Sequence, residues 1–370
     1  MSSHSPSSRL YGLDTLRALA IVLVFMNHYL LFVSDGDSFA FWGDIGWTGV
    51  DLFFALSGYL IGNQIFAALR SEQGFSLRHF YARRFLRTLP NFYVVLALFY
   101  WWPGFRGDNA LLPIWKFLTF TQNINLTPGT AFSHAWSLCV EEQFYVLLPA
   151  VAMLIAACRQ SLRWAWVAVA ASVMAGMLAR SYLWNEYVHV PHGGLGYYKY
   201  IYYASWCRFD ELVLGVALAL LKNYHPAAWS RITSYGNRTL LAGLAGTALM
   251  LFVFFTNHYA YWVTVVGYPA LAASFTLLLI AALSPASVLY QIRVPGAASL
   301  ALWSYAIYLL HKQLCILLKP VWQGLGYGAD SVPAILASMV ASIAAGWLLY
   351  VLVETPFMRL RARHVPANHA

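Results

Sequence analysis

An arginine and a histidine interrupt the first long apolar segment of the chain, GLDTLRALAIVLVFMNHYLLF, at residues 12–32. Arg17 and His28 are eleven residues apart, so on an α-helix they lie about 20° apart around the axis and about 16 Å apart along it. A guanidinium can bind phosphate oxygens with two parallel hydrogen bonds, and an imidazole can accept a proton near neutral pH. The spacing therefore predicts one polar stripe, with an anion-binding group near one end of the helix and a candidate general base towards the other.

Acidic and histidine side chains also lie inside later apolar segments. The segment HAWSLCVEEQFYVLLP carries His134, Ser137 and Glu141 at positions i, i+3 and i+7, which share one face of a helix. We expect Glu141 to lie at the same depth as His28, where its carboxylate can hydrogen-bond the imidazole and act with it in catalysis. Ionisable groups within a bilayer are costly and tend to mark functional sites. The residues that we expect to contact substrate are Asp51, His134, Ser137 and His311.

Each of these groups also has a simpler explanation. A single buried histidine is more often a hydrogen-bonded structural residue than a catalyst, and Arg208 with Asp210 in RFDELVLGVALA can form a neutralised structural pair. Three histidines and several acids in the same half of one helical bundle favour a functional interpretation.

A cluster of arginines precedes the third apolar segment, in RHFYARRFLRTLP. Arg83, Arg84 and Arg87 can anchor the helix end at the cytoplasmic surface, as basic residues commonly do. Because arginine forks match phosphate oxygens and Arg17 is expected just above the same surface, we expect these four arginines to form a phosphate cradle.

The elements that must position these residues are apolar and long. The chain is 60% hydrophobic and only 10% charged, whereas soluble domains average about 25% charged residues. About ten apolar runs recur, and about 20 residues suffice to span a bilayer as a helix. The sequence therefore predicts an all-α, polytopic membrane protein. The expected spans are 12–33, 48–69, 86–102, 137–157, 163–183, 205–222, 239–256, 260–283, 299–318 and 332–355.

The net charge of +9 could suggest a nucleic-acid partner, but its distribution indicates membrane topology instead. With the N-terminus inside, 15 of the 23 Lys and Arg residues fall in inner segments, 4 in outer segments and 4 within spans. This asymmetry predicts both termini in the cytoplasm and a multi-pass protein of the inner (cytoplasmic) membrane, without a nucleic-acid partner.

We expect one membrane domain over residues 9–360, a disordered tail at 1–8 and a short cytoplasmic tail at 361–370. The four cysteines have no metal-ligand spacing, so they are interpreted as packing residues and no metal is expected. Gly58 and Gly62 form a small-xxx-small pair that predicts a close helix contact. The Tyr-rich loop 184–204 is either a surface connector or an aromatic lip that stacks on a sugar.

Seven motifs in order resemble the acyltransferase-3 family of membrane acyltransferases over residues 8–360. They are the Arg17/His28 pair, DLFFALSGYLI, ARRFLRTLP, WSLCVEEQFY, RFDELVLGVALA, SYAIYLLH and VETPF. The resemblance implies ten transmembrane helices and transfer of an acyl group, usually acetyl, from cytoplasmic acyl-CoA to a hydroxyl of an extracytoplasmic glycan or lipid-linked sugar. It implies that His28 is the catalytic histidine, Arg17 an acyl-CoA contact and Glu141 the glutamate of the WSL-type motif. The chain ends at Ala370, so it looks like the stand-alone type without an SGNH domain.

Two interpretations of the polar stripe remain open. As an acyltransferase, the protein would bind CoA phosphates at Arg83, Arg84 and Arg87, and His28 would act as general base or through an acyl-histidine. As a transporter, it would move an acyl group or a lipid-linked sugar and use its buried His and Glu groups as a proton relay. A transporter would be expected to have paired broken helices in two related halves, and no such repeat is evident.

Overall fold

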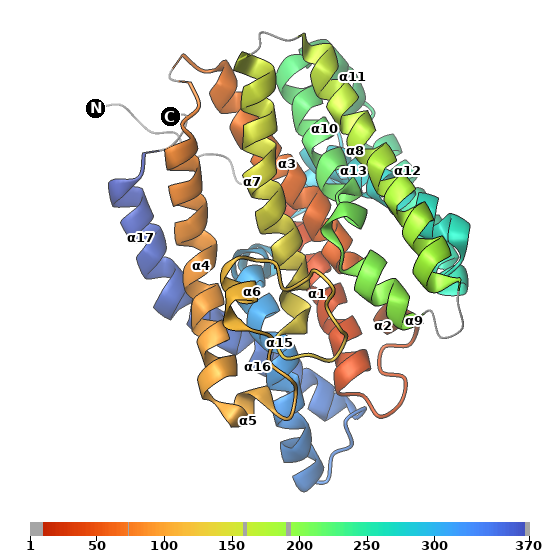
Figure 1. Cartoon of the computed structure of the whole chain (residues 1–370), viewed down its shortest axis with the longest axis vertical. Coiled ribbons are helices and arrows are strands. Elements are labelled where there is room, and N and C mark those ends of the chain that lie inside the picture. Colours follow the sequence, from red (N-terminus) through yellow and green to blue (C-terminus); the bar gives the residue numbers. More distant parts are fainter. Residues whose placement is uncertain (1–9, 73, 158–160, 190–193, 367–370) are drawn as a thin grey trace.

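The computed structural model describes residues 10–72, 74–157, 161–189 and 194–366, and within these ranges every regular element is a helix. Long helices run roughly along one axis of an elongated bundle (Figure 1). They are α1 (Tyr11–Phe32), α3 (Thr48–Arg70), α4 (Leu77–Trp101), α7 (Trp136–Ala157), α8 (Leu162–Leu183), α10 (Asp210–Tyr224), α12 (Asn237–Asn257), α13 (Tyr268–Leu283), α15 (Ala297–Gly324), α16 (Val332–Leu349) and α17 (Thr355–His364).

Shorter helices and turns connect these elements. They are α2 (Phe41–Ile45), α5 (Pro103–Arg106), α6 (Ile114–Leu118), α9 (Gly194–Gly196), α11 (Pro226–Ser234) and α14 (Val288–Gln291), the 3₁₀ turns Ser133–Ala135 and Ser205–Cys207, and the π-helical turns Trp184–Val188, Tyr197–Tyr202, Val263–Gly267 and Tyr350–Glu354.

Each of the ten predicted spans contains a helix, which confirms an all-α polytopic membrane protein. In the described part of the chain, eight helices are long and apolar enough to cross a membrane. The other two are α10, with 15 residues, and α4, which carries Arg78, Arg83, Arg84 and Arg87 in its first half. The predicted tail at 361–370 begins inside α17, whereas the predicted disordered residues 1–8 lie outside the described residues.

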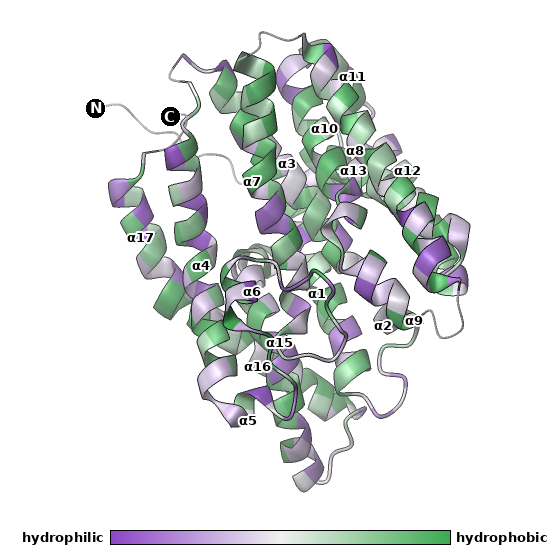
Figure 2. Cartoon of the chain, in the orientation of Figure 1, coloured by the Kyte–Doolittle hydropathy of each residue, from purple (hydrophilic) through white to green (hydrophobic). Residues whose placement is uncertain are grey.

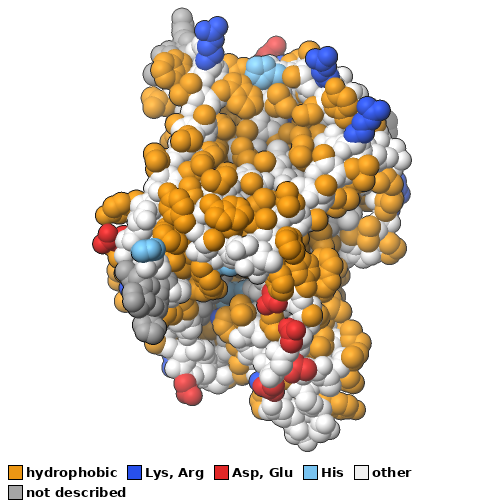
Figure 3. Space-filling view, turned by 90° about the vertical axis from the view of Figure 1, so that its right-hand side faces the viewer, with side chains coloured by type: hydrophobic (Ala, Val, Ile, Leu, Met, Phe, Trp, Pro, Cys, Tyr) orange, Lys and Arg blue, Asp and Glu red, His pale blue; other side chains and the backbone are white. Residues whose placement is uncertain are grey.

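The two ends of the bundle differ in charge. On the face drawn in Figure 3, hydrophobic side chains cover much of the middle, Lys and Arg lie mainly at the upper end, and several acidic side chains lie towards the lower end. In Figure 2, hydrophilic residues also lie along α4 and within α7, in an otherwise hydrophobic bundle. Helix α11, in a segment predicted to be cytoplasmic, lies at the upper end, and α5, in a segment predicted to be outside, lies at the lower end (Figure 1).

The close contact predicted from Gly58 and Gly62 is confirmed, and its partner is α10. A Cβ atom on Gly58 would overlap the backbone of Leu212, and one on Gly62 would lie 3.1 Å from the Cβ atom of Ala219. Gly215 of α10 faces the backbone of α3 in the same way. Small residues on both helices therefore let the two backbones approach closely.

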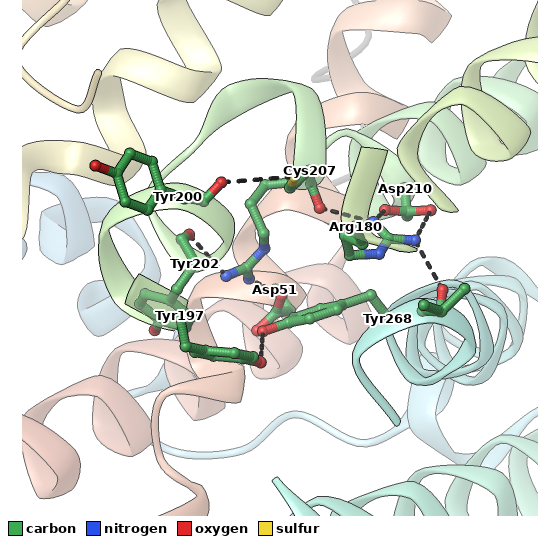
Figure 4. Close-up of polar contacts among 10 residues, drawn as sticks. Asp51, Arg180, Tyr197, Tyr200, Tyr202, Cys207, Asp210 and Tyr268 are labelled. Carbon is green, nitrogen blue, oxygen red and sulfur yellow. Dashed lines mark hydrogen bonds and ion pairs between the residues drawn. The ribbon is translucent and has the colours of Figure 1, made fainter. Parts of the chain in front are cut away.

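Two fully buried ion pairs connect α3, α8, α10 and the turn before α10 (Figure 4). Arg208 pairs with Asp51 of α3, and Arg180 of α8 pairs with Asp210 of α10. The predicted Arg208–Asp210 pair is therefore wrong in its partners, because the 3₁₀ turn before α10 directs the two side chains to different helices. Each of these four charged side chains still lies next to one of opposite charge, which offsets the cost of its burial.

The segment between α4 and α7 covers the start of α7. Phe105, Phe117 and Phe132 pack with Phe92 and Phe99 of α4 in one aromatic cluster. The 3₁₀ turn Ser133–Ala135 that leads into α7 is buried beneath this segment. Helix α7 therefore begins well inside the protein and not at the outer membrane surface. Its residues lie deeper than expected for a helix that starts at that surface.

Candidate active site

One cavity of about 550 Å³ gathers arginines from three helices, and we call it the arginine cavity. Arg17 reaches it from α1 and Arg361 from α17, and the three arginines of α4 complete the set. The residues of α4 that line it are Phe80, Arg83, Arg84, Arg87 and Thr88. The four arginines expected to lie together therefore do so, with a fifth that the sequence did not single out.

Acidic and aromatic groups hold Arg84 in place within this cavity. Its guanidinium lies 3.7 Å from Glu141 and 3.8 Å from Glu142, and it stacks 3.9 Å from the ring centroid of Tyr145. The Nε atoms of Arg84 and Arg361 are buried, and neither has a hydrogen-bond partner among the residues that the structure describes. Buried donors without a partner are unfavourable, so the cavity is suited to a ligand that brings anionic oxygens.

A second cavity of about 350 Å³ contains His28, and we call it the histidine cavity. His28 and Asn27 lie near the far end of α1 from Arg17, and His134 and Lys312 face the same space. Aromatic rings form much of its wall, and they are Phe32, Trp47, Trp136, Tyr198, Tyr202, Tyr203, Phe254, Phe255 and Tyr259. Three of these tyrosines belong to the loop 184–204, which favours the aromatic-lip interpretation of that loop over a plain connector.

The imidazole of His28 is paired with another histidine. Its Nδ1 atom lies 2.8 Å from Nε2 of His311, which is only 1% exposed. His134 lies close by, with ring centroids 6.0 Å apart, and its Nε2 donates to the backbone carbonyl of Leu309 at 3.2 Å. The three histidines predicted in one half of the bundle thus form one cluster.

A hydrogen-bonded partition lies between the two cavities. The hydroxyl of Tyr308 lies 2.7 Å from Ser137 Oγ and donates to the backbone carbonyl of His134 at 2.5 Å. Ser137 and Tyr308 line the arginine cavity, whereas His134 lines the histidine cavity.

The predicted contact between Glu141 and His28 is wrong. Glu141 lines the arginine cavity, where its carboxylate accepts a hydrogen bond from Tyr145 at 2.8 Å. The cause is the buried start of α7, which places Glu141 near Arg84 instead of at the depth of His28.

Asp51 is also placed differently from its prediction. Its carboxylate is fully buried against Arg208 and lines neither of the two cavities. We therefore assign Asp51 to the buried ion pair and not to substrate contact.

Several residues that line the two cavities were not predicted from the sequence. Lys312 was counted only as a charge within a span, although an intramembrane cation is itself a functional signal. Arg361 was counted only as an inner charge. Tyr308 lies within the motif SYAIYLLH, but it was not singled out there, because tyrosine is common in apolar segments.

A family model described as an acyltransferase domain matches residues 10–351. The chain belongs to the acyltransferase-3 family. This confirms the resemblance read from the seven motifs, and the match covers both cavities apart from Arg361.

Curated relatives extend the comparison. The chain is 28% identical to the putative peptidoglycan O-acetyltransferase YrhL of Bacillus subtilis over 366 residues, which cover 93% of this chain and 54% of that protein. It is 27% identical to the peptidoglycan O-acetyltransferase OatA of Listeria monocytogenes over 369 residues, which cover 94% of this chain and 56% of that protein. The chain thus spans about half the length of the curated relatives it matches. No solved structure matches it.

Proposed function

We propose that this acyltransferase-3 protein is a membrane O-acyltransferase of the inner membrane, which moves an acyl group from cytoplasmic acyl-CoA to a hydroxyl of an extracytoplasmic carbohydrate. The observation that carries the proposal is the position of Arg17 and His28 in two different cavities at opposite parts of one helix. A donor site and an acceptor site on either side of a membrane require such an arrangement.

The donor would bind in the arginine cavity. The nucleotide of CoA carries several phosphate groups, and arginine binds phosphate with bidentate, charge-assisted hydrogen bonds. Arg83, Arg84, Arg87 and Arg361 would hold the phosphates, and Arg17 would contact the arm that carries the thioester. Glu141 and Glu142 would then position the Arg84 guanidinium instead of acting on the reacting atoms.

The acyl group would be transferred in the histidine cavity. There, His28 accepts the proton of the acceptor hydroxyl while its oxygen attacks the thioester carbonyl. The new C–O ester bond replaces the C–S bond, and the CoA thiolate leaves with the proton that His28 took up. For the thioester to reach His28, the Tyr308–Ser137 partition must open during the reaction cycle.

The acceptor would be a carbohydrate that stacks on the aromatic wall. Tyr198, Tyr202 and Tyr203 provide ring faces beside His28, and aromatic rings combine an apolar face with a polar tip. The names of both relatives specify peptidoglycan. We therefore propose a glycan of the cell envelope as acceptor and acetyl as the transferred group.

The test is transfer from radiolabelled acetyl-CoA by purified protein in nanodiscs, with cell-wall glycan as acceptor. The His28→Gln variant is expected to bind acetyl-CoA normally and to lose transfer by about 10²–10⁴-fold, because the general base is absent. His364→Gln, at an exposed position on α17, is the matched control. Undiminished transfer by His28→Gln would rule out the base, and binding without transfer by the wild type would favour a transporter.

A further inference from the structure

His311 carries its proton on a defined ring atom. Its Nδ1 lies 3.0 Å from the backbone carbonyl oxygen of Ile307 and 3.0 Å from that of Tyr308. A carbonyl oxygen can only accept a hydrogen bond, so Nδ1 of His311 must be the donor and must carry a hydrogen. In the neutral imidazole, Nε2 of His311 is then left with a lone pair.

That lone pair faces His28. Nε2 of His311 lies 2.8 Å from Nδ1 of His28, so Nδ1 of His28 must supply the hydrogen between them. The ring planes differ by only 6°, and their centroids are 4.9 Å apart. The two rings are therefore nearly parallel, and the short nitrogen–nitrogen contact joins one edge of each ring. A neutral His28 with hydrogen on Nδ1 has its own lone pair on Nε2.

We propose that His311 is a positioning residue that fixes His28 in the Nδ1-protonated tautomer, so that Nε2 is the basic atom offered to the histidine cavity. His311 itself is 1% exposed and lines neither of the two cavities, so it acts through His28 and not on substrate. The role in catalysis rests on the function proposed above, whereas the tautomer assignment does not.

The assignment fits the proposed proton transfer. When Nε2 of His28 takes the hydroxyl proton, the ring becomes an imidazolium, and its Nδ1–H continues to donate to Nε2 of His311. A hydrogen-bond acceptor behind a catalytic histidine fixes the tautomer and stabilises the cation. The neutral imidazole of His311 thus has the position behind His28 that was predicted for the carboxylate of Glu141. The other charged or titratable side chains around the pair are Lys312, His134 and Tyr308.

The decisive experiment is nitrogen NMR of protein labelled with ¹⁵N-histidine, in which the signals of His28 are assigned by their loss in His28→Gln. In the wild type we expect a protonated Nδ1 and an unprotonated Nε2 for His28. In His311→Phe, which keeps an apolar ring but removes the acceptor, we expect His28 to shift towards the Nε2-protonated tautomer. An Nε2-protonated His28 in the wild type, or an unchanged tautomer in His311→Phe, would overturn the proposal.

Transfer activity supplies a second readout. His311→Phe should slow acyl transfer by about 10²–10⁴-fold, because the wrong tautomer offers no base. His311→Gln should recover part of the rate, since its amide oxygen can accept from Nδ1 of His28. Equal losses in the Phe and Gln variants would contradict the role of the acceptor. If the tautomers are as expected but the wild type transfers no acyl group, the proposed function fails and the tautomer assignment stands.

Discussion

Arg17 reaches the arginine cavity from α1, the helix that also carries His28. Replacing it with alanine should raise KM for acetyl-CoA by about 10- to 100-fold, because one charge-assisted hydrogen bond is worth about 1.5–3 kcal/mol. KM for the acceptor should change little. Steady-state kinetics with each substrate varied in turn measures both constants. Arg231→Ala, at an exposed position on α11, is the control, and equal increases in both constants would mean that Arg17 is structural.

Helical spacing predicted how single residues are arranged along one helix. The eleven-residue separation of Arg17 and His28 predicted two separate positions on α1, and these lie in two cavities. Their chemical roles stay predictions. The depth of Glu141 could not be predicted, because it depends on how residues 103–132 fold over the start of α7. A sequence gives distances along a helix but not the level at which the helix begins.

At the scale of elements, the packing of α3 on α10 depends on the absence of side chains at Gly58 and Gly215. Gly58→Ala should destabilise the protein by about 1–3 kcal/mol or more, because a Cβ atom would overlap the backbone of Leu212. Thermal unfolding in detergent, followed by intrinsic fluorescence, measures the effect. Gly324→Ala is the matched control, since a Cβ atom there meets nothing within 4 Å. Similar unfolding temperatures for the two variants would contradict the close contact.

The buried pair of Asp51 and Arg208 joins α3 to the turn before α10. Asp51→Asn should cost about 3–5 kcal/mol, because it leaves the Arg208 charge buried without its partner. The loss should appear in the same unfolding assay, with Asp108→Asn at an exposed position as control. A loss no larger than that of the control would show that water or another group compensates the Arg208 charge.

The helical type of the long elements was predictable, but their ends were less so. Apolar runs gave a helix for each of the ten predicted spans, and the start of α4 was predicted at residue 86 but lies at Leu77. The reason is that hydropathy detects the lipid-facing part of a helix, whereas the Arg-rich first turns of α4 form helix without being apolar. Which buried charges pair with each other could not be predicted, because the partners come from different helices.

At the scale of the whole molecule, a polar clamp joins the loop after α1 to the loop before α16. Asp330 accepts hydrogen bonds from Ser34 and Ser38 and from the backbone nitrogen of Asp35. Lys319 of α15 pairs with the Asp35 carboxylate at 2.5 Å. Burial disfavours the charged form of Asp330, but these hydrogen bonds outweigh it, so the pKa of this carboxyl lies below its ordinary value.

The lowered pKa predicts how the clamp depends on pH. A carboxyl with a lowered folded-state pKa stabilises the protein fully above its unfolded pKa of about 3.9, and this contribution is lost as pH falls through the folded-state value. Asp330→Asn should therefore unfold at a lower temperature than the wild type at pH 7. The difference should shrink as the pH falls below about 4. A difference that stays constant down to pH 3 would mean that ionisation of Asp330 contributes nothing.

The Tyr308 partition also has an electrical consequence. A protein with one cavity facing each aqueous phase would be a pore if the two cavities were continuous, and protons would then flow down the membrane potential. The Tyr308 hydroxyl, held between Ser137 and the carbonyl of His134, closes that route with short bonds inside the chain itself. In the proposed function, the partition would act as an electrical insulator, so that an acyl group could pass between the two compartments without a leak of protons.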